Sequence, residues 1–340
     1  MTTHRIGING LGRIGRAVLR QGLDDRRLTV AGVNDLDDPN GLAYLLRYDS
    51  VYGRDTRFDG AEGGRLRVAG GDIPVSRESS PAAIPWDTVG AGIVVESTGA
   101  FRSRADAAGH FEAGAHHVIL SADSDDADVV IVPGVNDDDL DPEQHTFISM
   151  ASCTTNALAP VLQALDGAFG IENAYFTTVH AYTASQTVVD KVARHRRRGR
   201  AAALNIIPTT TGAAKAVVKV LPHLAGRVTG MAMRVPVPSG SVVDVVARVG
   251  REVTPGEVND ALRAAAARPA MGPVLAVADD ELVSQDIVGD THSSVVDARS
   301  TGVLNGNTVK VLAWYDNEWG YAARLVDLAR RLGDLTAKAG

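Results

Sequence analysis

The chain contains one cysteine, Cys153, whose position suits a nucleophilic thiol. It follows an apolar, strand-like run at residues 146–150 and precedes a segment with apolar residues at the spacing of an amphipathic helix. Cys153 is therefore expected at or near a helix N-terminus, where the helix dipole and free N–H groups lower a thiol pKa. A lone cysteine is also often an inert buried side chain, and Pro160 is expected to fit poorly inside this helix.

His180 is the second candidate for proton transfer, because it ends a strand-like run at residues 176–180. A histidine within hydrogen-bond reach of a thiol can accept its proton and return it later. The spacing alone does not show that His180 meets Cys153, so a structural histidine is an equal alternative. The pair His116 and His117 has no carboxylate or thiol at ligand spacing, and we predict no metal site.

A glycine-rich turn near the N-terminus has the pattern G-x-G-x-x-G, followed by Asp35 20 residues beyond its last glycine. Gly10 permits a tight turn, Gly12 lets the backbone approach a pyrophosphate, and Gly15 lets the helix pack closely on the strand. Asp35 would bind ribose hydroxyls and repel a 2′-phosphate, which favours NAD. The segment predicts dinucleotide binding, although a glycine-rich turn in another α/β protein has a similar pattern.

Three further features suit anions. The small polar residues 209–212 precede a helical pattern and could present hydroxyl and N–H groups to a phosphate. Arg234 lies in an apolar strand, where a charge needs a partner or an anionic ligand. Residues 191–200 are strongly cationic, and a solvated loop or a surface for an acidic partner or RNA would explain them equally well.

The chain divides into two parts of different pattern. Up to about residue 150, short apolar runs such as residues 28–33 alternate with helical patterns, which predicts βαβ units and a parallel sheet. Residues 55–72 are typical of a hairpin or a loop. From about residue 170, longer strands such as residues 241–249 predict an α+β domain with a mixed, largely antiparallel sheet. The last 20 residues have the spacing of an amphipathic helix.

Composition limits the class of protein. At roughly 150 residues per domain, 340 residues suggest two domains. The net charge of −7, from 34 basic and 41 acidic residues, gives no general reason to expect binding to nucleic acid or an anionic membrane. One cysteine excludes an intramolecular disulfide. No apolar run approaches the ~18 residues of a membrane span, and no signal-peptide core is present, so we expect a cytoplasmic protein.

Together these motifs resemble the phosphorylating glyceraldehyde-3-phosphate dehydrogenase family. The stretches that carry the resemblance occur in family order at residues 8–16, 151–156, 180–183, 201–215, 230–236 and 314–321. The resemblance implies an α/β fold with a Rossmann-type NAD-binding domain over residues 1–152 and 318–340, to which the C-terminal helix returns. It also implies an α+β catalytic domain over residues 153–317.

The resemblance implies oxidation of glyceraldehyde 3-phosphate to 1,3-bisphosphoglycerate. Cys153 matches the nucleophile, which forms a thiohemiacetal and then a thioester, and His180 matches the base. Hydride passes to the nicotinamide, and inorganic phosphate then releases the product. The resemblance also assigns residues to the substrate phosphate (Thr183, Arg234), the attacking phosphate (Ser152, Thr154, Arg198, Thr211, Gly212) and the cofactor (Gly10, Gly12, Arg13, Ile14, Gly15, Asp35, Asn317).

The resemblance further implies a homotetramer, with the cationic residues 191–200 in a loop at its interface. The sequence departs from the family at three places. Ala157 stands where a second cysteine is common, and Asp123 stands where proline is usual. Lys191 and Val192 replace a pair that lines the adenosine ribose. A lysine there would attract a 2′-phosphate that Asp35 repels, so NAD is favoured and use of NADP stays open.

Two alternative functions stay open at the level of sequence. The same chemistry could act on another sugar phosphate such as erythrose 4-phosphate, although the intact motifs at residues 180–183 and 208–212 argue against it. An inactive relative could bind nucleotides or RNA through the cationic residues 191–200, although every residue that the chemistry needs is present.

Overall fold

The computed structural model describes residues 3–339, which belong to two compact units. Unit 1 comprises the chain up to Ile131, the segment Asp138–Ala151, and the chain from Ala322 onward. Unit 2 comprises Val132–Asp137 and Ser152–Tyr321. Each unit contains its own large sheet, so the molecule has the predicted α/β fold class, with two differently organised sheets.

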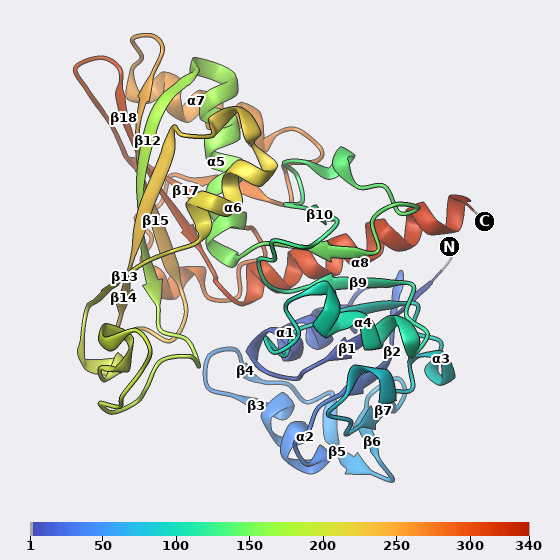
Figure 1. The fold of residues 1–340 in the computed structure, drawn as a ribbon. Coiled ribbons are helices and arrows are strands. Elements are labelled where there is room, and N and C mark those ends of the chain that lie inside the picture. Colours follow the sequence, from blue (N-terminus) through green and yellow to red (C-terminus); the bar gives the residue numbers. More distant parts are fainter. Residues whose placement is uncertain (1–2, 340) are drawn as a thin grey trace. The chain divides into compact units, whose positions relative to one another are not determined.

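Unit 1 is built on a nine-stranded sheet in the order β10-β11-β9-β8-β1-β2-β7-β6-β5 (Figure 1). All neighbouring pairs from β10 to β7 are parallel, which confirms the predicted parallel sheet. The segment at residues 55–72 forms an antiparallel hairpin that extends one edge. The strands are β1 (His4–Asn9), β2 (Leu28–Asn34), β5 (Phe58–Glu62), β6 (Arg65–Val68), β7 (Ile73–Ser76), β8 (Ile93–Glu96), β9 (His117–Leu120), β10 (Val129–Val130) and β11 (Phe147–Ser149).

The helices of unit 1 begin where local sequence favours them. Ser103 and Asp106 form a capping box at the start of α4, and Asp38 caps α2 with Pro39 in its first turn. The C-terminal part of α8 is held beside β1 because Asp334 accepts a hydrogen bond from His4 at 2.9 Å. The helices are α1 (Arg13–Gly22), α2 (Pro39–Arg47), α3 (Trp86–Val89), α4 (Arg104–Glu112) and α8 (Trp319–Ala339), of which α8 begins in unit 2.

Unit 2 is built on a seven-stranded sheet in the order β13-β14-β12-β15-β18-β17-β16. The sheet is mixed and largely antiparallel, as predicted, with parallel pairs only at β12–β14 and β16–β17 among the described strands. Its strands are β12 (Ile171–Ala181), β13 (Ile207–Thr209), β14 (Val228–Val235), β15 (Ser241–Val249), β16 (Leu275–Ala278), β17 (Ser294–Leu304) and β18 (Thr308–Tyr315).

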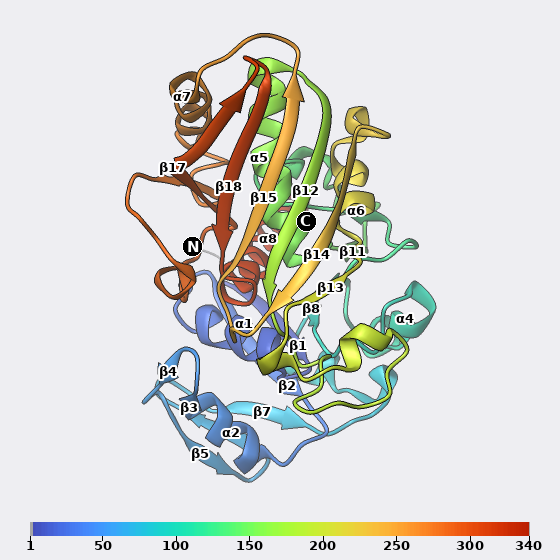
Figure 2. The same ribbon diagram turned by 90° about the vertical axis from the view of Figure 1, so that its left-hand side faces the viewer.

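Three helices cover one face of this second sheet: α5 (Cys153–Phe169), α6 (Ala213–Val220) and α7 (Pro255–Ala266) (Figures 1 and 2). Most residues of the central helix, α5, are buried, and the helix continues through Pro160 without ending there. Within residues 3–339, no helix combines the length and apolar character needed to cross a membrane.

Candidate active site

Cys153 is the first residue of α5, as the sequence predicted. Ser152 is the N-cap, and its hydroxyl accepts a hydrogen bond from the backbone N–H of Thr155 at 3.1 Å. Ala151, just before the cap, has φ 53°, in the left-handed region that a residue with a Cβ rarely adopts. A strained residue two positions before a candidate nucleophile is the kind of outlier that occurs at functional sites.

His180 lies near the end of β12 and meets Cys153. The distance between Cys153 Sγ and His180 Nε2 is 3.4 Å, so a proton can pass between these atoms. The opposite ring nitrogen, Nδ1, lies 2.7 Å from the carbonyl oxygen of Ala181 and 2.8 Å from Nη1 of Arg234. Parallel pairing of β12 with β14 produces this contact, because it places His180 opposite Arg234.

Burial dominates the electrostatics of this pair. Burial and the neighbouring Arg234 lower the pKa of His180 to about 3, so the imidazole is neutral at physiological pH. Burial also raises the pKa of the Cys153 thiol, while Arg234 and the N–H groups of Thr154 and Cys153 itself lower it. The expectation of a low thiol pKa at the helix N-terminus is therefore wrong. Desolvation of Cys153 raises its pKa by more than Arg234 and the N–H groups lower it. The site holds a neutral thiol beside a neutral imidazole.

Arg234 and Arg198 make this site electropositive. Among the described residues Arg234 forms no ion pair with a carboxylate, and its buried Nε has no hydrogen-bond partner. Burial lowers the pKa of Arg234, and the charge of Arg198 lowers it further. Arg198 is held in place because it donates to the hydroxyl of Thr209 at 2.9 Å and to the carbonyl of Thr210 at 3.1 Å. Two guanidinium groups without a neutralising carboxylate suit an anionic ligand.

The other residues expected around phosphate occupy varied positions. The Thr154 hydroxyl points into the protein and lies 3.0 Å from the Tyr315 hydroxyl. Thr183 follows β12 and pairs with the Ser185 hydroxyl at 2.9 Å. Gly212 is the N-cap of α6, and Thr211 accepts a hydrogen bond from Ala213 N–H at 3.2 Å. Among the described residues no hydrogen bond joins Thr183, Thr211 or Gly212 to Cys153.

Two buried hydroxyls at this site were not predicted from the sequence. Tyr315 Oη lies 3.0 Å from Thr154 Oγ1 and 2.7 Å from Thr178 Oγ1, and the ring edge meets the His180 ring at 5.9 Å between centroids. Burial raises the pKa of Tyr315, so this hydroxyl stays protonated. It therefore ties the segment that bears Cys153 to the strand that bears His180.

Ser241 is the second of these hydroxyls. It accepts a hydrogen bond from Ala181 N–H at 3.0 Å and donates to Oδ1 of Asn317 at 2.8 Å, which fixes the orientation of the Asn317 amide. Tyr315 lies within the stretch 314–321 that carries the family resemblance, which is a signal that could have identified it. Ser241 had only the alternating pattern of its strand.

The glycine-rich turn in unit 1 brings the backbone of β1 and α1 into close contact. Gly10 has φ +90°, and a Cβ on Gly15 would lie 1.8 Å from the carbonyl oxygen of Gly10. Gly12 is the N-cap of α1 with no side-chain cap, and a Cβ there would meet no atom within 4 Å. The first turn of α1, with Arg13 and Ile14, therefore starts without a capping side chain, and a helix N-terminus of this kind suits a phosphate.

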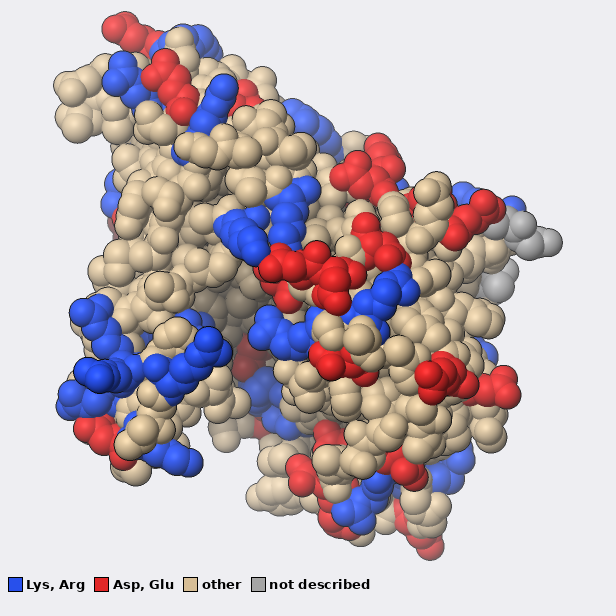
Figure 3. Space-filling view, in the orientation of Figure 1, with Lys and Arg blue, Asp and Glu red and all other residues tan. Residues whose placement is uncertain are grey.

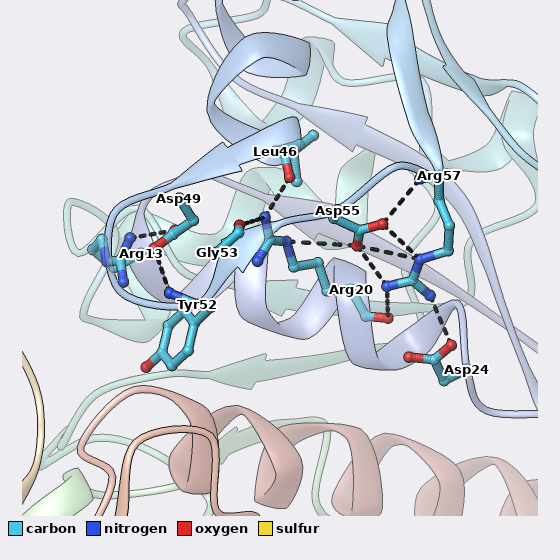
Figure 4. A network of polar contacts seen from close by, with 9 residues as sticks. All are labelled: Arg13, Arg20, Asp24, Leu46, Asp49, Tyr52, Gly53, Asp55 and Arg57. Carbon is cyan, nitrogen blue, oxygen red and sulfur yellow. Dashed lines mark hydrogen bonds and ion pairs between the residues drawn. The ribbon is translucent and has the colours of Figure 1, made fainter. Parts of the chain in front are cut away.

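Asp35 and Arg13 flank this turn. Asp35 follows β2, and its carboxylate accepts hydrogen bonds from Leu11 N–H at 2.6 Å and Asp37 N–H at 3.0 Å. The Arg13 guanidinium lies 2.5 Å from Asp49 and 5.2 Å from the ring centroid of Tyr52 (Figure 4). Its side chain thus ties α1 to the β3–β4 hairpin (Tyr48–Asp49, Gly53–Arg54).

The cationic segment at residues 191–200 lies on the surface of unit 2. Figure 3 shows blue side chains gathered over this part of the chain. Lys191, Arg194, Arg196, Arg197 and Arg200 are exposed, whereas Arg198 is partly buried against residues 209–210. The segment therefore offers a solvated basic surface together with one arginine directed inward.

Two family models match the chain. One, described as the glyceraldehyde 3-phosphate dehydrogenase NAD binding domain, matches residues 4–104, and the other, described as the C-terminal domain of the same enzyme, matches residues 152–317. Relatives with the name glyceraldehyde-3-phosphate dehydrogenase include proteins from Geobacillus stearothermophilus, 53% identical over 325 residues, and Kitasatospora aureofaciens, 51% identical over 329 residues. These alignments cover 96% of this chain and 97% and 98% of the two relatives.

The match spans both units and includes the residues that bring a thiol, an imidazole and a guanidinium together. The chain belongs to the glyceraldehyde 3-phosphate dehydrogenase family.

Proposed function

We propose that this protein oxidises glyceraldehyde 3-phosphate to 1,3-bisphosphoglycerate with NAD and inorganic phosphate. One observation carries the proposal: Cys153 Sγ lies 3.4 Å from Nε2 of a neutral His180, beside the uncompensated charge of Arg234. A neutral imidazole can take a thiol proton, and the adjacent guanidinium suits a phosphate on the substrate.

The first step joins the thiol to the aldehyde. His180 Nε2 takes the proton of Cys153, and the sulfur forms a bond to the carbonyl carbon. The carbonyl oxygen gains the electron pair of its broken π bond and receives the proton from His180, which completes a thiohemiacetal. The backbone N–H groups at the start of α5 point toward this region and would stabilise the developing oxyanion.

The second step produces a thioester. His180 takes the hydroxyl proton of the thiohemiacetal as the carbon loses a hydride, and the carbonyl forms again. Bound NAD would accept that hydride. A phosphate oxygen then bonds to the acyl carbon, and Cys153 departs as a thiolate, which recovers a proton from His180. The phosphate loses its proton to solvent, and its phosphorus and four oxygens remain in the product, so the reaction consumes phosphate stoichiometrically.

The two phosphate groups need separate binding residues. We assign the substrate phosphate to Thr183 and Arg234, because Arg234 carries an unpaired charge next to His180. We assign the attacking phosphate to Arg198 together with residues 152, 154, 211 and 212, since the positive dipole ends of α5 and α6 favour an anion there. The Thr154 hydroxyl would have to share its bonding capacity with Tyr315.

We assign cofactor binding to residues 1–152 and 318–340 and catalysis to residues 153–317. NAD would be held by the α1 N-terminus, by Asp35 and by the amide of Asn317. The exposed Lys191 leaves NADP as a second cofactor to be tested, although Asp35 disfavours its 2′-phosphate.

We further propose a cytoplasmic homotetramer. The segment around the cationic residues also exposes apolar side chains, which include Val188 at 83%, Val192 at 98% and Leu204 at 82%. Apolar groups gathered on one surface usually mark a contact with another chain. The cytoplasm also keeps a free thiol such as Cys153 reduced. Sedimentation analysis of the purified protein would test the oligomeric state directly.

Intact-mass spectrometry tests the proposed chemistry. Enzyme mixed with NAD and glyceraldehyde 3-phosphate, with phosphate omitted, should accumulate one acyl group on Cys153, and phosphate should remove it. Erythrose 4-phosphate at the same concentration should acylate the protein more slowly. Absence of an acyl group with either sugar phosphate, from protein that is folded and binds NAD, would contradict the proposal. Tight RNA binding that survives physiological salt would then favour the alternative of an RNA-binding relative.

A further inference from the structure

A fully buried carboxylate in unit 1 takes no part in the proposed reaction. Glu96, the last residue of β8, accepts hydrogen bonds from Asn9 Nδ2 at 2.6 Å, from His110 Nε2 at 3.1 Å, and from the backbone N–H of Thr98 at 2.8 Å. The Thr98 hydroxyl donates a fourth bond. Four donors that converge on one buried carboxyl group satisfy it as an anion.

The direction of the bond from His110 is fixed by its other neighbour. Trp86 Nε1 lies 3.0 Å from His110 Nδ1, and an indole N–H can only donate. Nδ1 of His110 is therefore the acceptor, and the hydrogen of this imidazole must sit on Nε2, directed at Glu96.

The direction of the bond from Asn9 is fixed in the same way. Asn34 Nδ2 donates to Asn9 Oδ1 at 2.8 Å, so the amide nitrogen of Asn9 must face Glu96. Asn34 is oriented in turn because its Oδ1 accepts from Glu78 N–H at 2.9 Å and from Ser76 Oγ at 2.9 Å. Neither an amide flip nor a change of tautomer is available within this network.

The network joins the ends of three parallel strands. Asn9, Asn34 and Glu96 are the last residues of β1, β2 and β8. The next residues along the chain begin the glycine-rich turn, the segment with Asp35, and the loop with Thr98. Gly10 N–H also donates to Asn34 O at 2.8 Å, and Ser97 Oγ donates to the carbonyl oxygen of Gly10 at 2.8 Å. Ligands of open α/β sheets bind at this carboxyl edge.

We propose that Glu96 and His110 are positioning residues for the dinucleotide. The buried carboxylate of Glu96 holds together three loops at the carboxyl edge of the sheet, and two of these loops contain residues assigned above to NAD. The proposal rests on the NAD binding proposed above. It assigns to Glu96 no contact with the cofactor, only control of the backbone that makes those contacts.

The variant Glu96→Gln tests the proposal because it keeps the shape and removes the charge. The amide nitrogen of Gln would replace one of the two carboxylate oxygens of Glu96. In one orientation it would face the donors of Thr98, and in the other it would face those of Asn9 and His110. Because Asn9 and His110 cannot present an acceptor instead, the loops must shift to relieve the contact between two donors. The dissociation constant for NAD, measured by calorimetry, should therefore rise at least ~10-fold. Alkylation of Cys153 in the absence of NAD should keep its wild-type rate. The KM for NAD should rise, with kcat at saturating NAD within about twofold of wild type.

A matched pair at His110 guards against a variant that fails to fold. His110→Leu removes one donor and leaves three on Glu96, so the protein should fold and bind NAD several-fold more weakly. His110→Gln retains a donor for Glu96 and an acceptor for Trp86, so it should restore most of the affinity. Phe58→Leu, in β5 at the far edge of the sheet, should lower stability and leave NAD affinity unchanged.

The outcomes separate this proposal from the proposed function. Weak NAD binding by Glu96→Gln and His110→Leu, with recovery in His110→Gln, supports it. Wild-type affinity in His110→Leu, or in folded Glu96→Gln, overturns it and leaves the proposed function intact. The same weakening in Phe58→Leu also overturns it, because stability alone would then explain the effect. Failure of the wild-type protein to bind NAD overturns both.

Discussion

Arg234 acts on both side chains that exchange a proton. Its charge lowers the pKa of His180 and the pKa of the Cys153 thiol. For His180 this effect adds to burial, and for Cys153 it opposes burial. The guanidinium of Arg234 therefore makes the Cys153 thiol easier to deprotonate and keeps the His180 imidazole neutral. A neutral imidazole is the form that can accept the thiol proton.

Arg234→Gln should consequently raise the apparent pKa for alkylation of Cys153 by iodoacetamide, because the positive charge that favours the thiolate is lost. It should also raise the KM for the sugar phosphate, because the proposed anion contact is lost. The pH dependence of the alkylation rate measures the first effect, with Arg197→Gln, an exposed arginine nearby, as the control. An unchanged alkylation profile would show that Arg234 does not act on the thiol.

His180 makes the folded protein sensitive to acid. Its pKa falls from 6.5 to about 3 on folding. Between these two pH values the imidazole is protonated in the unfolded chain and neutral in the folded chain. Stability from this group is complete above pH 6.5 and is lost as the pH falls toward 3. When the pH falls from 7 to 4, the free energy of unfolding should decrease by about 3 kcal/mol less in His180→Asn than in the wild type. Denaturant titrations at several pH values would measure this, and parallel curves for the two proteins would refute it.

The identities of the reacting residues could be predicted from the sequence, and their electrostatics could not. Cys153 and His180 were recognisable from flanking patterns and from the family motifs. Their pKa values depend on burial and on Arg234, which reaches His180 only because β12 and β14 pair in one register. His180 and Arg234 are 54 residues apart in sequence. The register that pairs them is a tertiary property, so local sequence patterns cannot predict it.

Three secondary-structure elements meet at the Tyr315 hydroxyl. Tyr315 ends β18, Thr154 lies in the first turn of α5, and Thr178 lies in β12. Helix and strand are thus held at the separation that gives the contact between Cys153 and His180. A hydroxyl on a rigid aromatic ring suits this task because it can donate one hydrogen bond and accept another.

Tyr315→Phe should therefore lower both stability and turnover. Loss of two buried hydrogen bonds should cost about 1–3 kcal/mol of unfolding free energy, and kcat should fall roughly tenfold with little change in KM. Steady-state kinetics and denaturant unfolding measure these effects. Tyr175→Phe, a half-exposed tyrosine on β12, is the control. Full turnover in Tyr315→Phe would show that this contact does not position the pair.

Elements with strong local signals were predictable, and those held by distant contacts were not. The apolar spacing after Cys153 predicted α5 with a start at or near its observed first residue. The pattern did not indicate α2 or β17, and it left residues 55–72 as either hairpin or loop. In the structure this region is fixed by an ionic network in which Asp55 pairs with Arg57 and with the buried Arg20 of α1 (Figure 4). Such cross-element contacts appear only after the chain has folded.

The nucleotide unit should gain stability from its cofactor. A ligand that binds only the folded state stabilises it by about 2.7 kcal/mol at 100 times its dissociation constant. NAD should therefore raise the thermal unfolding midpoint of the apoprotein in a concentration-dependent way. NADP at equal concentration should raise it less, because Asp35 opposes the 2′-phosphate. Equal shifts would mean that Lys191 offsets Asp35, and no shift with either would contradict cofactor binding.

Consumption of phosphate is the property that distinguishes the proposed activity of the whole molecule. The decisive measurement is steady-state NADH formation from glyceraldehyde 3-phosphate and NAD as inorganic phosphate is varied. The rate should saturate with phosphate and fall to that of slow thioester hydrolysis without it, with one equivalent of 1,3-bisphosphoglycerate formed per NADH. Steady turnover that does not depend on phosphate would contradict the proposed activity.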